Sequence, residues 1–256
     1  MDAVLRRIDA FCDQVPRRWA STVDVGPLRL FTMDSSGRAF YARPAPGGGP
    51  VTPADVVRVC ARQRKLDAPE EFEWVLAAAP SMVEATRSAG LDVHVCPLLV
   101  LDGDPVPGVL PPGYSARLLG PADGDLPSTA HAVRAVTAAA FGVPSPGALT
   151  GSELATLRAD LAAGTVGRVL VTGPGGPIAA GSAHRSGAVV ELVGIGTAAA
   201  ARGRGLGAAV TALLAAAARD AGAELVFLAA GDDAATRVYE RVGFRRVGEC
   251  GIANRQ

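Results

Sequence analysis

The feature that most constrains this chain is a group of glycines at the start of the alanine-rich segment AARGRGLGAAVTALLAAAARDAG, residues 200–222. Glycine costs a helix about 1 kcal/mol relative to alanine, yet Gly203, Gly205 and Gly207 stand in or beside the first turn of a strong helix former. The first N–H groups of a helix have no intrahelical acceptor and carry the positive end of its dipole. Without Cβ atoms in the way, they form a phosphate cradle. The sequence therefore predicts a helix start that binds pyrophosphate, with two arginines adding positive charge at its rim.

Two common phosphate-binding motifs do not fit this segment. A P-loop requires G-x-x-x-x-G-K-[ST], but the only lysine of the chain is Lys65. Residues 194–199 match the dinucleotide pattern G-x-G-x-x-A, which expects an acidic residue at the end of the next strand, about 20 residues later. Asp220 instead lies at the end of a predicted helix, before that strand begins. Both motifs are therefore disfavoured.

Composition argues against several classes of function. The 256 residues include 25 Lys+Arg and 25 Asp+Glu without a basic block, so we expect no nucleic-acid partner. The four cysteines are widely spaced and the three histidines do not cluster with them, which indicates free thiols in a reducing cytoplasm and no metal site. No signal peptide is recognisable, and no run reaches the ~18 apolar residues of a membrane span. We therefore expect a cytoplasmic protein without a membrane segment.

A segment rich in proline and glycine divides the chain. DGDPVPGVLPPG, residues 102–113, contains four prolines and three glycines and cannot continue a helix or a central strand. We predict an N-terminal domain over residues 1–102, a linker over 103–112 and a C-terminal domain over 113–256. Both domains have the alternating pattern of an α/β protein.

The predicted strands of the C-terminal domain are 114–119, 166–173, 177–187, 188–197, 224–230 and 244–253, and its predicted helices are 125–141, 151–164, the segment after Gly205, and 232–242. Strands 166–173 and 177–187 form a predicted hairpin. Ser152 is the predicted cap of the helix at 151–164. The N-terminal domain is thinner: it has predicted helices at 2–15, 53–65 and 80–90 and predicted strands at 28–33, 38–43, 71–77 and 91–101, with a turn at 34–37.

A shift of 153 residues relates the ends of the two domains. It places Gly90 on Gly243 and Trp74 on Phe227, so that strand, helix, glycine and strand recur in one order. Almost no residue identities survive the shift. We interpret the pattern as a faint internal repeat.

Two neighbouring motifs resemble one family of enzymes. The pattern Arg202-x-x-Gly205-x-Gly207 follows the predicted strand VVELVGIGT, and DDAATRVYERVGF at 232–244 contains Tyr-x-x-x-Gly-Phe. Together they resemble the coenzyme-A-binding motifs of the GNAT acyltransferase superfamily, over about residues 113–252. The resemblance implies a mixed α/β (α+β) GNAT fold around a central, mostly antiparallel sheet. The N-terminal part then looks like a smaller, degenerate second copy, as in tandem members of the superfamily.

The resemblance also implies a set of residues for the co-substrate acetyl-CoA. In the family a splayed strand leaves backbone groups free for the pantetheine arm, and one N–H polarises the thioester carbonyl. The matching residues of the strand and the phosphate cradle are Ile195, Gly196, Thr197, Arg202, Gly203, Arg204, Gly205, Leu206, Gly207 and Ala208.

Two side chains match catalytic positions of the family. Tyr239 aligns with the general acid that protonates the departing CoA thiolate, although a tyrosine here could instead only contact CoA. Glu191 precedes Arg202 by 11 residues, the spacing of a glutamate base in some members; a solvated position or a role in substrate binding is the alternative. His184 is expected to be structural. Asp232 stands where the family often has asparagine.

The N-terminal copy lacks these features. The shift of 153 residues sets Thr86 opposite Tyr239 and GPVTPA opposite RGRGLG. We therefore expect that this half binds no CoA and either covers a sheet edge or walls the acceptor cleft.

The leading hypothesis is an acetyl-CoA-dependent N-acyltransferase that moves an acetyl group to a primary amine on a small molecule or peptide. The alternative is a non-catalytic module that senses acetyl-CoA or serves as a scaffold. A third hypothesis makes the N-terminal half the contact of a homodimer.

Overall fold

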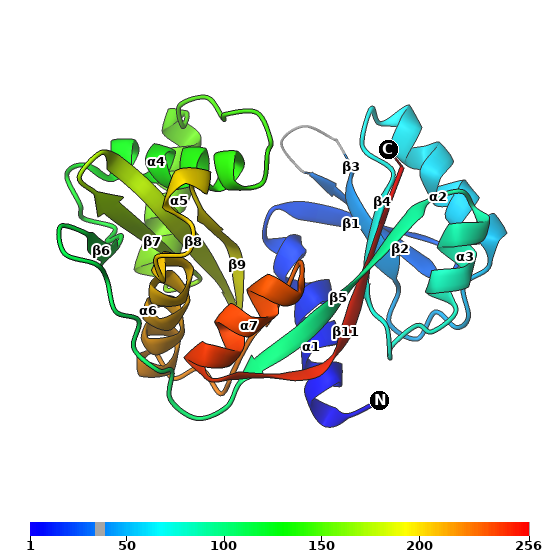
Figure 1. Ribbon diagram of the computed structural model, residues 1–256. Coiled ribbons are helices and arrows are strands. Elements are labelled where there is room, and N and C mark those ends of the chain that lie inside the picture. The colour runs from blue at the N-terminus through cyan, green and yellow to red at the C-terminus, as the bar shows by residue number, and fades with distance from the viewer. Residues whose placement is uncertain (34–38, 256) are drawn as a thin grey trace. The chain divides into compact units, whose positions relative to one another are not determined.

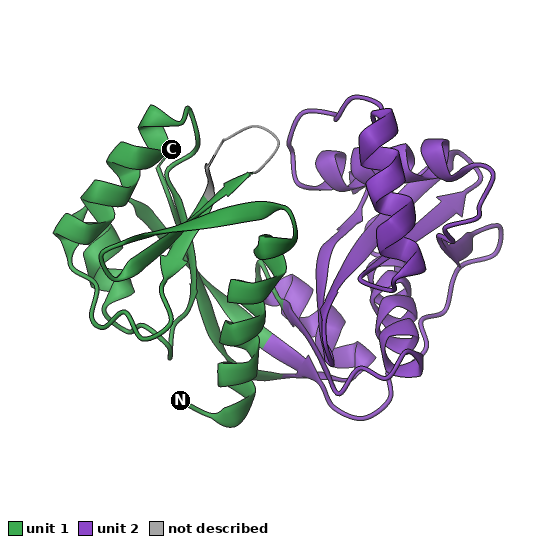
Figure 2. Cartoon of the chain, turned by 180° about the vertical axis from the view of Figure 1, so that it is seen from behind, with its two compact units in different colours: residues 1–98, 229–232, 246–256 green, residues 99–228, 233–245 purple. Residues whose placement is uncertain are grey.

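The computed structural model describes residues 1–33 and 39–255 (Figure 1). The chain forms two compact units, and each is built from separate pieces of sequence (Figure 2). Unit 1 comprises Met1–Leu98, Ala229–Asp232 and Arg246–Gln256, and unit 2 comprises Leu99–Leu228 and Asp233–Arg245. The final residues of the chain thus belong to the unit that contains its beginning. The predicted turn at 34–37 lies outside the described residues.

Unit 1 is a sheet with helices. Its elements are α1 (Ala3–Gln14), the 3-10 turn η1 (Val15–Arg18), β1 (Ala20–Val25), β2 (Leu28–Met33), β3 (Ala39–Pro44), α2 (Pro53–Lys65), β4 (Glu71–Val75), α3 (Met82–Ser88), β5 (Asp92–Leu101) up to Leu98, and β11 (Phe244–Asn254) from Arg246 onward. The strand order is β1-β2-β3-β4-β11-β5. Strand β1 was not predicted from the sequence, whereas the three helices were.

The last strand of the chain occupies an interior position in this sheet. β11 pairs antiparallel with β4, from Val75 opposite Cys250 to Glu71 opposite Asn254. On its other side, the Cys250 Sγ lies 3.7 Å from the Cys96 carbonyl oxygen of β5. Ala253 is fully buried in one hydrophobic core with Phe72 and Met82. The C-terminal residues are therefore part of the N-terminal unit's core.

Unit 2 contains the remaining elements. They are β6 (Ser115–Leu118), α4 (Leu126–Ala140), α5 (Gly151–Ala162), β7 (Val166–Gly173), β8 (Gly176–Ser186), β9 (Val189–Thr197), the 3-10 turn η2 (Ala199–Ala201), α6 (Leu206–Asp220), β10 (Leu225–Ala229) and α7 (Asp233–Val242). Neighbouring strands follow the order β10-β9-β8-β7-β6. Among these described strand pairs of unit 2, β9–β10 is parallel and the other three are antiparallel, so the predicted mixed α/β fold with a mostly antiparallel sheet is confirmed.

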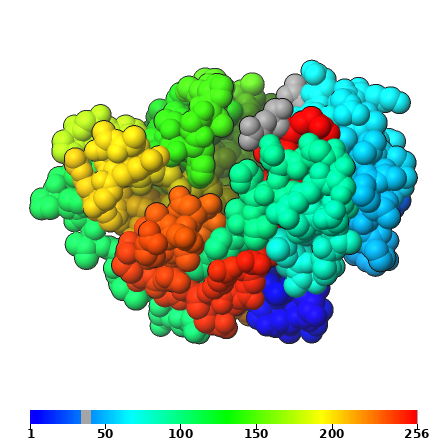
Figure 3. Space-filling model, turned by 45° about the vertical axis from the view of Figure 1, so that its right-hand side comes forward, coloured from blue at the N-terminus to red at the C-terminus, as the bar shows by residue number. Residues whose placement is uncertain are grey.

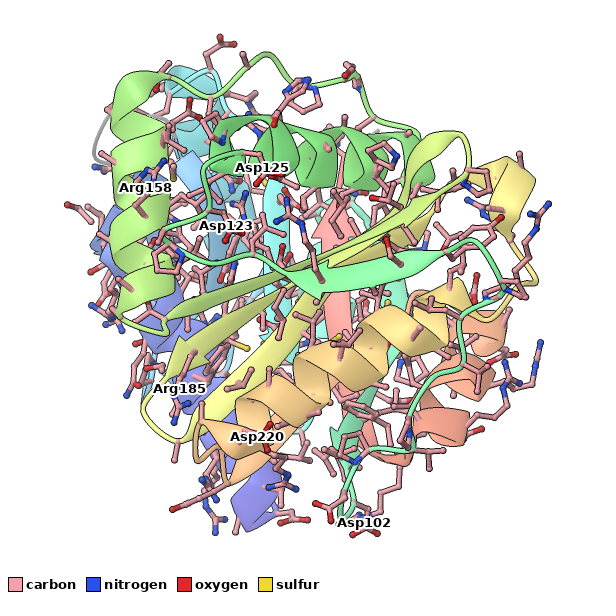
Figure 4. All side chains as sticks on the ribbon, turned by 90° about the vertical axis from the view of Figure 1, so that its left-hand side faces the viewer. Asp102, Asp123, Asp125, Arg158, Arg185 and Asp220 are labelled. Atoms are coloured by element: carbon pink, nitrogen blue, oxygen red, sulfur yellow. The ribbon has the colours of Figure 1, made fainter. Side chains whose placement is uncertain are left out.

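Helices cover both faces of the unit 2 sheet (Figure 4). α4 and α5 lie on one face and α6 on the other. The hairpin of β7 and β8 is confirmed. The predicted cap Ser152 is wrong: α5 begins after Thr150, which forms a capping box with Glu153. The Thr150 hydroxyl accepts from the Glu153 N–H at 3.2 Å, and the Glu153 carboxylate accepts from the Thr150 N–H at 2.7 Å.

Elements of the N-terminal half of the sequence recur in the C-terminal half in the same order. α2 begins at Pro53 and α6 at Leu206, a separation of 153 residues (206 − 53 = 153). The series β4, α3, β5 in turn corresponds to β10, α7, β11. This correspondence agrees with an internal repeat. None of the helices in the described ranges is long and apolar enough to cross a membrane.

Candidate active site

Strand β9 carries a bulge in its second half. The step from Ala180 to Ser182 on β8 faces the longer step from Gly196 back to Val193 on β9, so β9 has one extra residue there. Gly194 lies in this step with a φ of +60°, a conformation that costs glycine no steric strain. A bulge of this kind bends a strand and redirects its backbone groups.

The same part of β9 lies beyond its ladder with β10. The parallel register joins Val189 to Leu225 and ends where Glu191 pairs with Phe227, whereas β9 continues to Thr197. Backbone groups of residues 192–197 on the β10 side thus lie past the end of that register. A sheet edge of this kind can accept an extended ligand as an additional strand.

Close packing by α4 fixes the backbone at the bulge. A Cβ on Gly196 would lie 2.6 Å from the Cβ of Ala140, closer than real Cβ contacts. The Thr137 hydroxyl donates to the Gly194 carbonyl oxygen at 3.3 Å. The end of α4 therefore supports the bulged segment, and a side chain at position 196 would displace it.

The loop after β9 leads into the first turn of α6. Gly205 is the N-cap residue, with a φ of +77°, and the first helical bond runs from the Ala209 N–H to the Gly205 carbonyl oxygen at 3.0 Å. Within residues 1–33 and 39–255, the N–H groups of residues 206–208 have no acceptor. The nearest atom to a Cβ on Gly207 would be the Thr197 hydroxyl oxygen at 3.9 Å, so the space beside this residue of the first turn is open. The helix start that the sequence predicts thus lies at residues 205–208, with N–H groups available to an acceptor.

Two arginines flank the cradle. The Arg202 guanidinium donates to the Ala140 carbonyl oxygen at 3.2 Å and lies 3.4 Å from that of Thr197. Arg204 donates to the Tyr114 hydroxyl at 2.6 Å. These partners are neutral, so both exposed guanidinium groups retain uncompensated positive charge toward an anion. No pattern in the sequence singled out Tyr114.

Tyr239 lies on α7, which packs against α6 in unit 2. Only 9% of Tyr239 is exposed, and its ring centroid lies 6.4 Å from that of Phe244, with the rings tilted by 58°. The loop before α6, in yellow, and α7, in orange, both reach the surface on the same side of unit 2 (Figure 3). The aromatic ring is therefore held in one orientation within the unit that carries the cradle.

Glu191 on β9 stands opposite His184 on β8 in the antiparallel register. Directly opposed residues have their Cβ atoms about 4.5–5.5 Å apart on one face of the sheet. Both residues are half-buried. On the other side, Glu191 is level with the buried Phe227 of β10. This pairing places His184 beside a candidate base. The sequence analysis, which expected His184 to be structural, did not predict that position.

Residues 153–244 match the acetyltransferase (GNAT) family model. The chain contains a GNAT acetyltransferase domain. The whole chain is also similar to solved structures of this type. A GCN5-related N-acetyltransferase from Kribbella flavida is 26% identical, with a TM-score of 0.74, over 99% of this chain and 96% of that one. Among curated proteins, no sequence matches.

Two less similar structures share the fold. A GCN5-related N-acetyltransferase from Sphaerobacter thermophilus is 17% identical, with a TM-score of 0.61, over 99% of this chain and 89% of that one. A tandem GNAT protein from the clavulanic acid biosynthesis pathway is 18% identical, with a TM-score of 0.54, over 89% of this chain and 78% of that one. The GNAT domain match spans β7, β8 and β9, the cradle and Tyr239. Proteins of this family use acyl-CoA to acetylate amines.

Proposed function

We propose that the protein is an acetyl-CoA-dependent N-acetyltransferase that moves the acetyl group to a primary amine by direct attack. The observation that carries this proposal is the pairing, in one compact unit, of an open amide cradle at residues 206–208 with the bulged strand β9. The first holds an anion, and the second offers backbone groups to an extended chain. A pyrophosphate joined to a pantetheine arm has both parts.

The cradle residues would hold the pyrophosphate of the co-substrate. The amides of Leu206, Gly207 and Ala208 donate to phosphate oxygens, and the exposed Arg202 and Arg204 add charge at the rim. Gly203 and Gly205, both with a φ of +77°, let the loop turn around the ligand. Ile195, Gly196 and Thr197 would then pair with the pantetheine arm.

The reaction forms one C–N bond and breaks one C–S bond. A backbone N–H of the bulged segment polarises the thioester carbonyl as the neutral amine attacks. Tyr239 donates its phenolic proton to the departing thiolate, for which a group with an ordinary pKa of about 10 is suited. Glu191, directly or through a water, accepts the proton that the ammonium group must lose.

We further propose that the chain consists of two copies, with the domain boundaries 1–102, 103–112 and 113–256, and that the N-terminal copy binds no CoA. The start of α2 supports this. Pro53 has no N–H to offer, and the Asp55 carboxylate accepts from the Thr52 N–H at 2.8 Å. A carboxylate at this position repels a phosphate, whereas the equivalent turn of α6 has glycines.

A thiol-release assay with acetyl-CoA and a panel of primary amines tests the function, together with calorimetry of CoA binding. We expect micromolar CoA binding with one site per chain and turnover of at least one amine. Tight CoA binding without turnover of any amine would establish the alternative, a sensor or scaffold module. Absence of CoA binding would refute both.

A further inference from the structure

A charged side chain interrupts the apolar packing under α4. On this face of the unit 2 sheet, Leu126 and Val133 of α4 pack with Leu170 of β7 and Ala180 of β8 in one hydrophobic cluster. Arg168 precedes Leu170 by two residues on β7, so it lies on the same face of the sheet, opposite Ser182. An arginine at such a position is the exception to the pattern of this face.

The guanidinium group of Arg168 has unused donors. Its Nε and Nη1 atoms are buried, and neither has a hydrogen-bond acceptor in the part of the chain that the structure describes. Arginine does not lose its proton in proteins, so burial cannot be relieved by neutralisation. Buried donors of a charged group that lack acceptors destabilise the folded chain. A ligand oxygen would supply the missing acceptor.

The surroundings of Arg168 favour a ligand with one negative charge. Burial lowers the pKa of Arg168, the positive charge of Arg134 on α4 lowers it further, and Asp160 on α5 opposes the shift. Arg134 is already paired with Glu153 at 3.3 Å. The Asp160 carboxylate accepts from the Thr165 hydroxyl at 3.1 Å. A ligand with a single negative charge would neutralise the positive charge of Arg168. A ligand with two negative charges would also be repelled by the Asp160 carboxylate.

A second polar atom without a partner lies on the same helix. The Nδ1 of His131 is buried and has no hydrogen-bond partner among the residues described. His131 precedes Arg134 by three residues, so the two side chains are neighbours along α4. Helix α4 therefore carries a buried polar atom, without a partner in the described ranges, close in sequence to the arginine whose charge lowers the pKa of Arg168.

The strand register places Arg168 beside the candidate active site. Three rows of residues cross β7, β8 and β9: Leu170–Ala180–Gly196, Arg168–Ser182–Val193 and Val166–His184–Glu191. The row of Arg168 thus lies between the bulged backbone and Glu191. Strand spacing puts its Cα about 10 Å from β9, and each adjacent row is about 7 Å away along the strands. An arginine side chain spans much of that distance.

We propose that Arg168 binds a carboxylate of the acceptor, so that the substrate is an amino acid or another primary amine that carries one carboxylate. The inference rests on the proposed acetyltransferase function and names its substrate class. The amine would face Glu191 and the bulge of β9, while the carboxylate accepts hydrogen bonds from the guanidinium group. Arg168 is then the residue that selects anionic amines.

Matched substrates test this directly. Glycine, β-alanine and γ-aminobutyrate are each compared with the corresponding amide, in steady-state kinetics with acetyl-CoA. We expect a kcat/KM at least about 10-fold higher for the carboxylate of at least one pair. Arg168→Gln should remove that preference through a loss of about 10–100-fold on the carboxylate, with less than about 3-fold change on the amide. Equal kcat/KM for both members of every pair would overturn the proposal and leave the acetyltransferase function standing.

Arg185→Gln is the matched control. Arg185 lies on β8 and donates to the carbonyl oxygens of Gly187 and Ala221, both at 2.8 Å (Figure 4). The Arg185→Gln substitution removes one positive charge from the same sheet, but it should leave the preference for carboxylate over amide substrates unchanged. An equal loss in Arg185→Gln and Arg168→Gln would refute a specific role.

Stability gives a readout that does not depend on turnover. Because the buried Nε and Nη1 of Arg168 lack acceptors among the described residues, Arg168→Met should raise the melting temperature of the ligand-free chain by about 2–6 °C. A purely structural arginine predicts a fall instead, and a fall together with an unchanged substrate preference would overturn the assignment. If no amine is acetylated, calorimetry with glycine and β-alanine on the CoA-saturated chain decides separately: Arg168-dependent heat supports the anion site, and none refutes it.

Discussion

Glu191 on β9 and His184 on β8 are directly opposite each other in the antiparallel pairing of these strands. If Glu191 accepts the proton of the attacking ammonium, Glu191→Gln should lower kcat/KM by about 10²–10³-fold at neutral pH. The deficit should narrow toward pH 10, because an alkylamine then becomes neutral without a base. Initial rates from pH 6 to 10 give the comparison. A deficit that is constant over this range would assign Glu191 to substrate binding.

His184→Asn separates the two members of this pair. If His184 only positions Glu191, its replacement should reduce kcat modestly and keep the pH dependence of the parent protein. A pH profile that changes as in Glu191→Gln would show that the histidine takes part in proton transfer.

Tyr239→Phe removes the candidate acid but keeps the ring that contacts Phe244. We expect kcat to fall by about 10²-fold or more, with the Kd for CoA within about 3-fold. The loss should be smaller for acyl donors with a more acidic thiol, since these need less protonation on departure. Tyr41→Phe makes the same chemical change in unit 1 and should leave kcat unaltered. An unaltered kcat in Tyr239→Phe would remove tyrosine from the mechanism.

Gly207→Val fills the space before the amides of the cradle. A Cβ there meets only the Thr197 hydroxyl, at 3.9 Å, so the fold should tolerate the change, and valine has the higher helix propensity. The Kd for CoA should rise at least about 10-fold while the melting temperature stays within a few degrees. Gly175→Val, in an open turn without contacts within 4 Å, is the control. Unchanged CoA affinity would show that the pyrophosphate lies elsewhere.

Glu73 predicts how stability depends on pH. Burial and the neighbouring Glu71 raise the pKa of Glu73 from 4.5 to about 7, and Arg43 opposes the shift. Between these values the folded chain keeps a proton that the unfolded chain releases, so the free energy of unfolding falls as the pH rises. Glu73→Gln should therefore stabilise the protein at pH 8 by roughly 2–3 kcal/mol and by little at pH 4.5. Urea unfolding at several pH values measures this, with the exposed Glu84→Gln as control.

Local chemistry explains what could be predicted from the sequence. The glycines of the cradle and the cap Thr52 act within one turn of chain, and both lie where they were expected. The cap of α5 was missed although a local signal existed: Glu153 follows Thr150 by three residues, the spacing of a capping box. By residue type alone, Ser152 is as good a cap as Thr150. Only the glutamate three residues after Thr150 distinguishes the two positions.

Long-range pairing explains what could not be predicted. Arg168 has the sequence pattern of an ordinary polar residue in an alternating strand. Only the folded structure shows that it lies opposite Ser182 and that its Nε and Nη1 atoms are buried. The bulge at Gly194 likewise becomes apparent only when β9 is aligned with its partner strand β8. The place of β11 beside β4 depends on residues more than 170 positions apart, such as Val75 and Cys250 (250 − 75 = 175).

That place of β11 has a consequence for biosynthesis. The ribosome releases residues 1–98 long before it reaches Ala253, so the nascent N-terminal unit has a gap between β4 and β5 until β11 is synthesised. During that interval, unpaired strand edges are exposed to other chains, a situation in which chaperones commonly bind. Loss of residues 246–254, or an insertion within them, would thus first damage the unit that residues 1–98 begin.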